Sequence, residues 1–428
     1  MRLLVQRNRH FTEVSDSSDS SWRYFMSKII TASYPTTTSI DPLPKRQVKQ
    51  GTRLLFSVLL ILIALAKWSP AQQADIIQKH FGEFEGKPVS LYTLKNQHGM
   101  VAEISDFGGV VTKLIVPDRD GEFGDVVLGH TNFEKFINDS SFFGAIVGRF
   151  ANRIANGTFT LDDVQYQLAT NNAPNTLHGG NVGFNKRLWA ATTSLESGQP
   201  QLKLKYLSPD GEEGFPGNLD VTVTYTLTAD NGLKIDYLAT TDKTTVCNLS
   251  HHGYFNLAGM ESDSVLDHNL QLFCDNITPN NQHMIPTGDL MPVKDTPFDF
   301  LQPRKIGERI DEEDPQLKLG HGYDHNFVIN GEGGTLRRAA RVHDPSSGRV
   351  MEVMTTDYGV EFYTANFLSG PPSAKSELPM KPRMAFCLEC QRFPDTPNQP
   401  QFPSATLKPG EKYEKTTIYQ FSTDRQSE

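Results

Sequence analysis

Cysteine is scarce in this sequence, and so are the short motifs that mark many enzyme classes. Four cysteines in 428 residues are too few for a disulfide scaffold. The chain has no glycine-rich phosphate loop, no HxH or HExxH spacing for zinc and no GxSxG turn for a serine nucleophile. Sustained helical periodicity of apolar residues is also rare. The sequence therefore lacks the usual motifs of phosphate-loop, zinc and serine-nucleophile enzymes.

Net positive charge is confined to the amino-terminal end of the chain. Residues 1–70 hold 10 Lys and Arg against 4 Asp and Glu, a net charge of +6. The whole chain has a formal charge of −9, which leaves −15 on the remaining residues. An acidic body of this kind argues against nucleic acid as a partner. Hydrophobic residues make up 37% and aromatic residues 10% of the chain, which is enough for a large core and excludes global disorder.

The amino-terminal end lacks the pattern of a folded core. Residues 1–50 are rich in Ser, Thr, Arg and Pro and are predicted to be disordered. Residues 54–66 then form an apolar run of 13 residues, with basic residues before it and small residues after it. That order predicts a secretory signal peptide or a signal anchor over residues 51–72, because the run falls short of the roughly 20 residues of a membrane span.

The position of this apolar run leaves two interpretations open, since it begins some 50 residues into the chain. Either translation starts later, for example at Met26, or the run anchors the protein in a membrane. We expect an exported protein, periplasmic or secreted, with cleavage near Ala71, or one anchored in the membrane through residues 54–66.

From about residue 80 to the end, the chain shows short runs of alternating polar and apolar residues. Residues 219–241 contain two such runs around Asp230-Asn231-Gly232, and residues 157–168 contain two around Asp162-Asp163. Both are hairpin signals. Because no linker, charge block or repeat divides residues 80–428, we expect one large all-β domain, an antiparallel sandwich or barrel.

Two polar segments in the first half of this body do not read as strands. GRFANRIANG carries Arg149, Asn152 and Arg153, whose planar guanidinium groups suit sugar hydroxyls or carboxylates. A solvated surface position is the simpler explanation for an arginine. In NNAPNTLHGGNVGF, His178 precedes two glycines that let the backbone approach a ligand closely, although a structural histidine explains this residue equally well.

Two histidine-containing segments follow in the second half. VCNLSHHGYFNLAG holds His251 and His252, which would face opposite sides of a strand, so at most one of them faces a given cleft. The segment lacks the spacing and the neighbouring carboxylate of a metal site. In HGYDHNFVIN, Asp324 lies close to two histidines, and its carboxylate could bind hydroxyl groups or cap a turn.

The most informative single residue is Glu389, the one carboxylate in the apolar run from Met384 to Cys390. A carboxylate inside an apolar strand is costly unless it is paired or functional. Cys387 and Cys390 form a CxxC spacing, but in a strand they point to opposite faces and no second CxxC supports a zinc or redox site. Because side chains alternate between the two faces of a strand, Cys387 and Glu389 lie on the same face.

Taken in order, these segments resemble the aldose 1-epimerase (galactose mutarotase) family over about residues 85–425. The matching strings are GRFANRIANGTF, NTLHGGNVGFNKRLW, SPDGEEGFPGNL, NLSHHGYFNLAG, GYDHNFVIN, GVEFYTANF and FCLECQRFPDTPNQPQFPSATLKPGEKY. The resemblance implies a single large antiparallel β-sandwich with an open sugar cleft. It also implies an enzyme that interconverts the α and β anomers of free aldohexoses such as glucose and galactose, without a cofactor or a metal ion.

The resemblance also implies roles for individual residues of this chain. The family's general acid falls on His252 and its general base on Glu389, and the sugar-contacting positions fall on Asn152, Arg153, His178 and Asp324. The chain departs from the family pattern at His251-His252-Gly253, where Asn-His-Ser or Asn-His-Thr is common. It departs again at Glu361, where Gln is common. These departures bear on sugar preference more than on the type of reaction.

Mutarotation needs two proton transfers, one at the C1 hydroxyl and one at the ring oxygen, which suits an acid and a base acting together. In water Glu389 would be a weak base with a pKa of ~4.3. Burial would raise this pKa and Arg153 would lower it, and the sequence does not decide between them. Two alternatives remain open, a glycoside hydrolase that uses Asp324 and Glu389 and a non-catalytic sugar-binding module on the same fold.

Overall fold

The computed structural model describes residues 73–371 and 375–426. The chain divides into two units, Met1–Pro70 and Ala71–Glu428, and the described residues belong to the second. The predicted disordered segment over 1–50 and the predicted signal peptide or anchor over 51–72 lie outside the described residues. Among the helices of the described part, none has the length and apolar character needed to cross a membrane.

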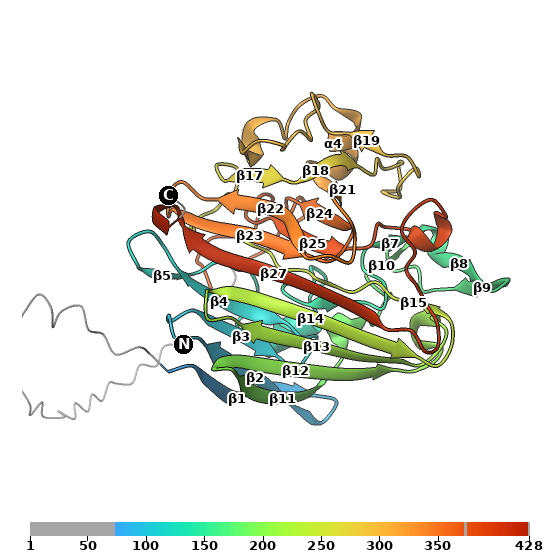
Figure 1. Ribbon diagram of the computed structural model, residues 1–428, viewed down its shortest axis with the longest axis horizontal. Coiled ribbons are helices and arrows are strands. Elements are labelled where there is room, and N and C mark those ends of the chain that lie inside the picture. Colours follow the sequence, from blue (N-terminus) through green and yellow to red (C-terminus); the bar gives the residue numbers. More distant parts are fainter. Residues whose placement is uncertain (1–72, 372–374, 427–428) are drawn as a thin grey trace, which may run out of the picture. The chain divides into compact units, whose positions relative to one another are not determined.

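The largest sheet has nine strands and runs through the middle of the second unit (Figure 1). Its hydrogen-bonded pairs are antiparallel, and β27, the last strand of the chain, lies between β14 and β23. The strands in spatial order are β11 (Ala190–Glu196), β12 (Gln199–Ser208), β13 (Leu219–Leu227), β14 (Gly232–Thr241), β27 (Tyr413–Thr423), β23 (Arg349–Thr355), β22 (Arg337–His343), β17 (Asn269–Leu272) and β20 (Arg304–Lys305).

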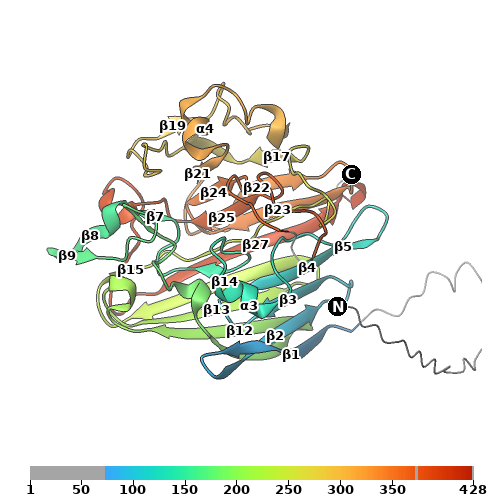
Figure 2. The same ribbon diagram turned by 180° about the vertical axis from the view of Figure 1, so that it is seen from behind.

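Two five-stranded antiparallel sheets accompany it, as Figures 1 and 2 show from opposite sides. The first, in spatial order, consists of β1 (Asp75–Phe84), β2 (Lys87–Lys95), β3 (Val101–Ser105), β4 (Val111–Pro117) and β5 (Phe123–Asp125). The second consists of β19 (Met291–Pro292), β18 (Cys274–Ile277), β21 (Asp324–Ile329), β24 (Gly359–Tyr363) and β25 (Cys387–Gln391). The large antiparallel β-sandwich expected from the sequence is confirmed.

The hairpins predicted from the sequence form at the expected places. β8 (Thr158–Leu161) pairs with β9 (Val164–Gln167) across a two-residue turn. Asp162 and Asp163 both have positive φ there, at 48° and 60°, as the type I′ turn of a tight hairpin requires. β13 and β14 pair on either side of Asn231, whose φ is 68°. Asp and Asn tolerate this left-handed conformation better than most residues.

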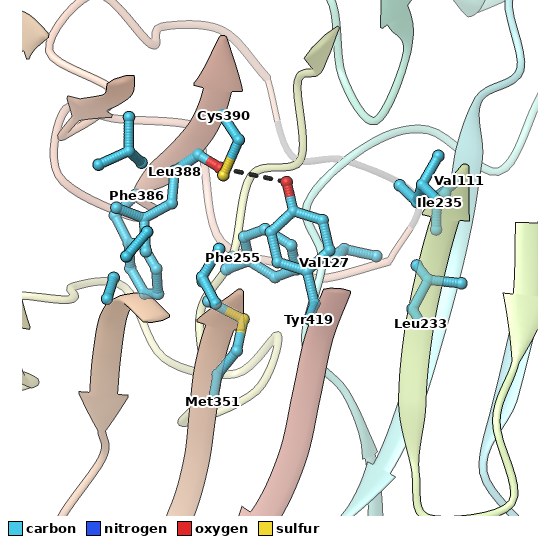
Figure 3. Packing of buried hydrophobic residues seen from close by; sticks show 14 of the residues in the cluster. Val111, Val127, Leu233, Ile235, Phe255, Met351, Phe386, Leu388, Cys390 and Tyr419 are labelled. Carbon is cyan, nitrogen blue, oxygen red and sulfur yellow. Dashed lines mark hydrogen bonds between the residues drawn. The ribbon is translucent and has the colours of Figure 1, made fainter. Parts of the chain in front are cut away.

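One continuous apolar core joins the nine-stranded sheet to both five-stranded sheets. Tyr419 of β27 packs on Phe255 with ring centroids 5.0 Å apart, and Met351 and Phe386 lie in the same cluster (Figure 3). The Tyr419 hydroxyl donates a hydrogen bond to the backbone oxygen of Leu388, 3.1 Å away. This contact fixes β25, the strand that carries Glu389, against the central sheet.

Short elements and loops build the end of the sandwich where the cleft opens. Two helices, α3 (Phe133–Ile137) and α4 (Pro315–Gly320), each span about one turn, and six 3₁₀ turns are described. Paired fragments of two residues include β6 (Ile146–Val147) with β16 (Ser250–His251), and β7 (Arg153–Ile154) with β10 (Thr176–Leu177). These fragments carry or flank the candidate site residues.

Candidate active site

A single cleft of about 540 Å³ brings together every site residue expected from the sequence. Its walls include Asn152, Arg153, His178, His252, Asp324 and Glu389. They come from five separate parts of the chain, and all but Arg153 are buried as whole residues. The fold therefore assembles these six side chains around one cavity. Arg153 lies on β7 of a two-stranded sheet, whereas Asp324 and Glu389 lie on β21 and β25 of the second five-stranded sheet.

The adjacent histidines His251 and His252 face different surroundings, as a strand requires. β16 ends at His251, whose ring lies in the core between Tyr225 and Tyr419, at centroid distances of 6.4 and 5.7 Å. Burial lowers the pKa of His251 to about 3. His252 lines the cleft instead, and its backbone N–H donates to the oxygen of Ala145. Of the two histidines, His252 is therefore the one that can meet a substrate.

His252 and Glu389 form the central pair of the cleft. The Nε2 atom of His252 lies 3.5 Å from Oε1 of Glu389, and the two side chains are 6% and 3% exposed. The Oε2 atom of Glu389 is buried and has no hydrogen-bond partner among the described residues. Because a buried carboxyl oxygen is costly to leave unpaired, this atom is suited to receive a polar group of a ligand.

Burial decides the protonation of this pair. It lowers the pKa of His252 to about 4, because the charged imidazolium loses its hydration. Burial and the nearby Asp324 carboxyl raise the pKa of Glu389 to about 8, against the opposing effects of Arg153 and Lys415. Desolvation thus outweighs Arg153, which was the balance that the sequence left open. Near neutral pH the empty site holds one proton, and it resides on Glu389.

Two aromatic rings stack on the His252 imidazole. Phe142 and Tyr254 stack on it at centroid distances of 5.8 and 5.0 Å, with interplanar angles of 17° and 15°. Phe142 adopts a φ of 60°, and its ring also lies 4.7 Å from that of His178. Neither aromatic residue was among the site residues expected from the sequence, because no local pattern sets either of them apart as part of a cleft.

His178 is held in one tautomer by the backbone. Its Nδ1 atom accepts a hydrogen bond of 3.1 Å from the backbone N–H of Asn152. The neutral ring must then carry its proton on Nε2, and burial together with His252 and Arg153 keeps the pKa of His178 well below its usual value. His178 therefore presents a hydrogen-bond donor to the cleft rather than a lone pair.

This tautomer bears on metal binding at the cleft. His178, His252 and Glu389 place potential ligand atoms within 4.8 Å of one another, close enough to share an ion. A metal ion on Nε2 of His178 would displace the proton that the Asn152 hydrogen bond requires there. The hydrogen bonding of His178 therefore opposes its use as a metal ligand.

Asp324 and Arg153 face each other beside this pair. Asp324 begins β21, and its Oδ2 atom lies 3.6 Å from Nη2 of Arg153. Asn152 has a φ of 63°, and its side-chain oxygen accepts a hydrogen bond from the Arg153 backbone N–H at 2.8 Å. This local turn lets the two consecutive residues both line the cleft. A carboxylate, a guanidinium and an amide side by side suit a ligand with several hydroxyl groups.

Arg149, which the sequence analysis considered as a surface or ligand-binding residue, has a structural role. It is 2% exposed and is not part of the cleft wall. Its guanidinium donates to the backbone oxygens of Pro216 and Gly217 at 2.9 and 2.8 Å, and to Ser208. Arg149 therefore ties the end of β12 to the loop of Pro216 and Gly217 instead of binding a ligand.

The cysteines confirm the strand geometry that argued against a CxxC site. All four are free and buried. The Sγ atom of Cys387 lies 3.6 Å from Nδ1 of His252, on the same side of β25 as Glu389. Cys387 also packs in a second hydrophobic cluster, whereas Cys390 belongs to the main core that joins the three sheets. The two cysteines of the CxxC spacing thus face opposite sides of the strand.

An all-β sandwich whose cleft pairs a buried imidazole with a carboxyl, beside hydroxyl-binding groups, is the architecture of an acid–base enzyme acting on sugars. A profile of the family described as aldose 1-epimerase matches residues 90–420. The chain is 46% identical to the galactose mutarotase of Bos taurus over 75% of this chain and 90% of that protein. The corresponding protein of Homo sapiens is 43% identical over 82% of this chain and 99% of its own length. The chain belongs to the aldose 1-epimerase family.

More distant relatives and solved structures agree. The aldose 1-epimerase of Escherichia coli K12 is 38% identical over 79% of this chain and 96% of that protein. The crystal structure of the galactose 1-epimerase from Lactobacillus acidophilus superposes with a TM-score of 0.73 at 27% identity, covering 82% of this chain and 99% of that chain. An aldose epimerase homologue from C. elegans gives a TM-score of 0.70 at 28% identity, with the same two coverages.

Proposed function

We propose that this chain is an aldose 1-epimerase that interconverts the α and β anomers of free aldohexoses, with glucose and galactose as the expected substrates. The observation that carries the proposal is the pair His252 and Glu389, 3.5 Å apart on the wall of a cleft of hexose-binding character. Polarimetry of freshly dissolved α-glucose or α-galactose tests it. A rate equal to that of buffer alone for every aldohexose tried would contradict it.

The proposed reaction moves protons between this pair and the sugar. Glu389 removes the proton of the C1 hydroxyl while His252 protonates the ring oxygen, and the bond between C1 and the ring oxygen breaks. The open-chain aldehyde forms, the C1–C2 bond rotates, and the ring closes on the other face with the two roles reversed. No covalent intermediate and no redox step is needed. Each half of the cycle transfers one proton in each direction.

The resting site matches one stage of this cycle. After ring opening, Glu389 holds the proton taken from C1 and His252 is neutral, which is the distribution that burial favours in the empty site. Ring opening starts from the opposite distribution, so with a pyranose bound the proton first passes from Glu389 to His252, whose Nε2 atom lies 3.5 Å from Oε1 of Glu389. Ring closure then starts from a neutral imidazole that accepts a proton and a carboxylic acid that donates one. The unpaired Oε2 atom of Glu389 is the acceptor we assign to the C1 hydroxyl.

The other cleft residues are proposed to bind the sugar hydroxyls. The Nε2–H group of His178 donates, because its Nδ1 atom is occupied by the Asn152 backbone. Asp324 accepts, and Arg153 donates from a position opposite it. Asn152 supplies an amide within the same wall. Hydrogen-bond donors and acceptors together match the hydroxyl groups of a hexose, and they orient the sugar toward His252 and Glu389.

The two alternatives weighed on the sequence are less favoured. Relatives that are 38–46% identical over most of the chain are epimerases or mutarotases by name, not glycoside hydrolases. A binding module has no use for a buried His252 and Glu389 at reacting distance, since both are costly to bury. Nitrophenyl glycosides that remain uncleaved while mutarotation is accelerated would separate the hydrolase from the epimerase.

We further propose that the protein is exported or membrane-anchored through residues 54–66. The support is the order of basic residues, a 13-residue apolar run and small residues. The amino-terminal sequence of the protein recovered from its host tests this. An end near residue 72 is expected after cleavage, and an intact end on a protein in the soluble internal fraction would contradict the proposal.

A further inference from the structure

Glu361 is a buried carboxyl group that the proposed reaction does not use. It lies in β24, the strand between β21 and β25 in the second five-stranded sheet. It is 2% exposed and is not among the residues that line the cleft. Tyr363, two residues further along β24, does line the cleft. Because residues two apart in a strand share a face, Glu361 points to the cleft side of the sheet but lies behind the cleft wall.

The strand register places Glu361 between the two acidic residues of the site. It is directly opposite Glu389 in the pairing of β24 with β25. On the other side β24 pairs with β21, where Asn326 lies opposite Glu361 and Asp324 lies opposite Tyr363. The carboxyl groups of Glu361 and Asp324 are within hydrogen-bonding reach of each other. The Oε2 atom of Glu361 accepts a hydrogen bond of 3.2 Å from the amide of Gln391.

The charges around Glu361 do not balance if all three carboxyl groups are ionised. The titratable groups that act on it from the neighbouring strands are Asp324 of β21, Glu389 of β25 and Arg153 of β7. Only Arg153 is cationic, and its Nη2 atom lies 3.6 Å from Oδ2 of Asp324. Burying three negative charges against one positive charge is costly. With Glu389 protonated, Asp324 and Glu361 would still place two buried negative charges beside Arg153, which favours a second proton on one of these two carboxyl groups.

Glu361 has the surroundings that favour the un-ionised form most strongly. Burial and the carboxylates of Asp324 and Glu389 raise the pKa of Glu361 well above its usual value, while Arg153 lowers it. Burial raises the pKa of Asp324, but Arg153 and the hydrogen bond from Glu361 both oppose that rise. A protonated carboxyl group beside an ionised one forms a strong, charge-assisted hydrogen bond. The proton therefore belongs to Glu361, and Asp324 accepts.

We propose that Glu361 is a positioning residue whose un-ionised carboxyl group donates a hydrogen bond to Asp324 and holds that carboxylate in place toward Arg153 and the bound sugar. Gln391 fixes the other oxygen of Glu361, so the donated proton points in one direction. Glu361 is not among the residues that line the empty cleft. This inference rests on the proposed function, because it takes Asp324 to be a sugar-binding residue.

The variants that test this are Glu361→Gln and Glu361→Met. The amide keeps the shape and an N–H donor but cannot ionise, and we expect its KM near neutral pH to stay close to that of the wild type. The methionine side chain of Glu361→Met has a similar length but no hydrogen-bond donor. We expect the KM of this variant to rise ~10-fold or more, with a smaller change in kcat. At alkaline pH the wild-type KM should rise as Glu361 ionises, while the Glu361→Gln variant keeps a constant KM.

Glu414, which is exposed on β27, provides the matched control through Glu414→Gln and Glu414→Met, neither of which should change KM. The inference is wrong if Glu361→Gln raises KM as much as Glu361→Met does, because an ionised carboxylate would then be required. It is also wrong if neither variant changes KM at any pH.

A second measurement does not depend on activity. The infrared difference spectrum of wild type minus Glu361→Gln should contain the carbonyl stretch of a carboxylic acid at neutral pH, and the absence of that band would overturn the inference. If the wild type fails to accelerate mutarotation of any aldohexose, the proposed function falls, and the band still decides the protonation of Glu361. If the wild type is active and the band is absent, only the inference falls.

Discussion

The ammonium group of Lys415 lies 3.0 Å from the Asp357 carboxylate, and the two side chains are 3% and 1% exposed. The same ammonium donates hydrogen bonds to the backbone oxygens of Leu249 and Cys390. Cys390 follows Glu389 directly, and Leu249 lies three residues before His252. One buried cation thus ties together the two chain segments that carry the proposed acid and base.

We predict that Lys415→Met destabilises the protein by about 3–5 kcal/mol, because it leaves the buried Asp357 carboxylate with Arg392 alone. Urea unfolding monitored by tryptophan fluorescence measures the change. Lys412→Met, three residues earlier and exposed, is the control and should change stability little. A loss no larger than that of the control would show that the buried pair does not stabilise the fold.

We predict that His252→Ala and Glu389→Gln each lower kcat for mutarotation by ~10²-fold or more, because each removes one of the two proton-transfer groups. Polarimetry gives the rates, and unchanged circular dichroism shows that the variants are folded. The controls are His98→Ala and Glu414→Gln, which make the same kinds of change at exposed positions. Wild-type rates in either site variant would remove that residue from its proposed role.

We predict a plateau of kcat/KM between pH about 4 and about 8. Below the plateau His252, whose pKa burial lowers to about 4, gains a proton and the pair carries two. Above it Glu389, whose pKa burial raises to about 8, loses its proton and the pair carries none. Rates are measured by polarimetry with the spontaneous rate subtracted at each pH. An activity that keeps rising through alkaline pH would contradict a single-proton working form.

We predict that Gly253 and His251 are energetically coupled. A Cβ atom at Gly253 would lie 2.8 Å from Cε1 of His251 and equally close to the ring of Phe255. Gly253→Ser should therefore cost about 1–3 kcal/mol of stability through overpacking. Adding His251→Asn removes one of the two clashes and should recover part of the loss, with a coupling energy of at least about 0.5 kcal/mol in a double-mutant cycle. Additive effects would show that the two positions are independent.

The fold class and the residues that form the cleft could both be predicted from the sequence. Strand alternation and turn residues such as Asp162 and Asp163 are local signals. The residues of the cleft stand in ordered strings, so His252 and Glu389 could be singled out before their contact was known. The opposite orientations of Cys387 and Cys390 followed from the two-residue period of a strand alone.

What the sequence could not give depends on contacts between distant segments. The pKa of Glu389 is set by how completely β21, β24 and the segment of His252 exclude water from it. The rings of Phe142 and Tyr254 meet His252 only in the folded chain. Arg149 reads as a surface residue until the loops of Ser208 and Pro216 close around it. No local pattern encodes these relationships.

The single proton shared by His252 and Glu389 has a consequence for how the catalyst recycles. In the proposed cycle ring opening moves that proton one way and ring closure moves it back, so each turnover ends with both side chains as they began. No exchange with the surrounding water is required between one sugar and the next. Both anomers pass through the same open-chain stage, so the site hastens equilibrium equally from both directions.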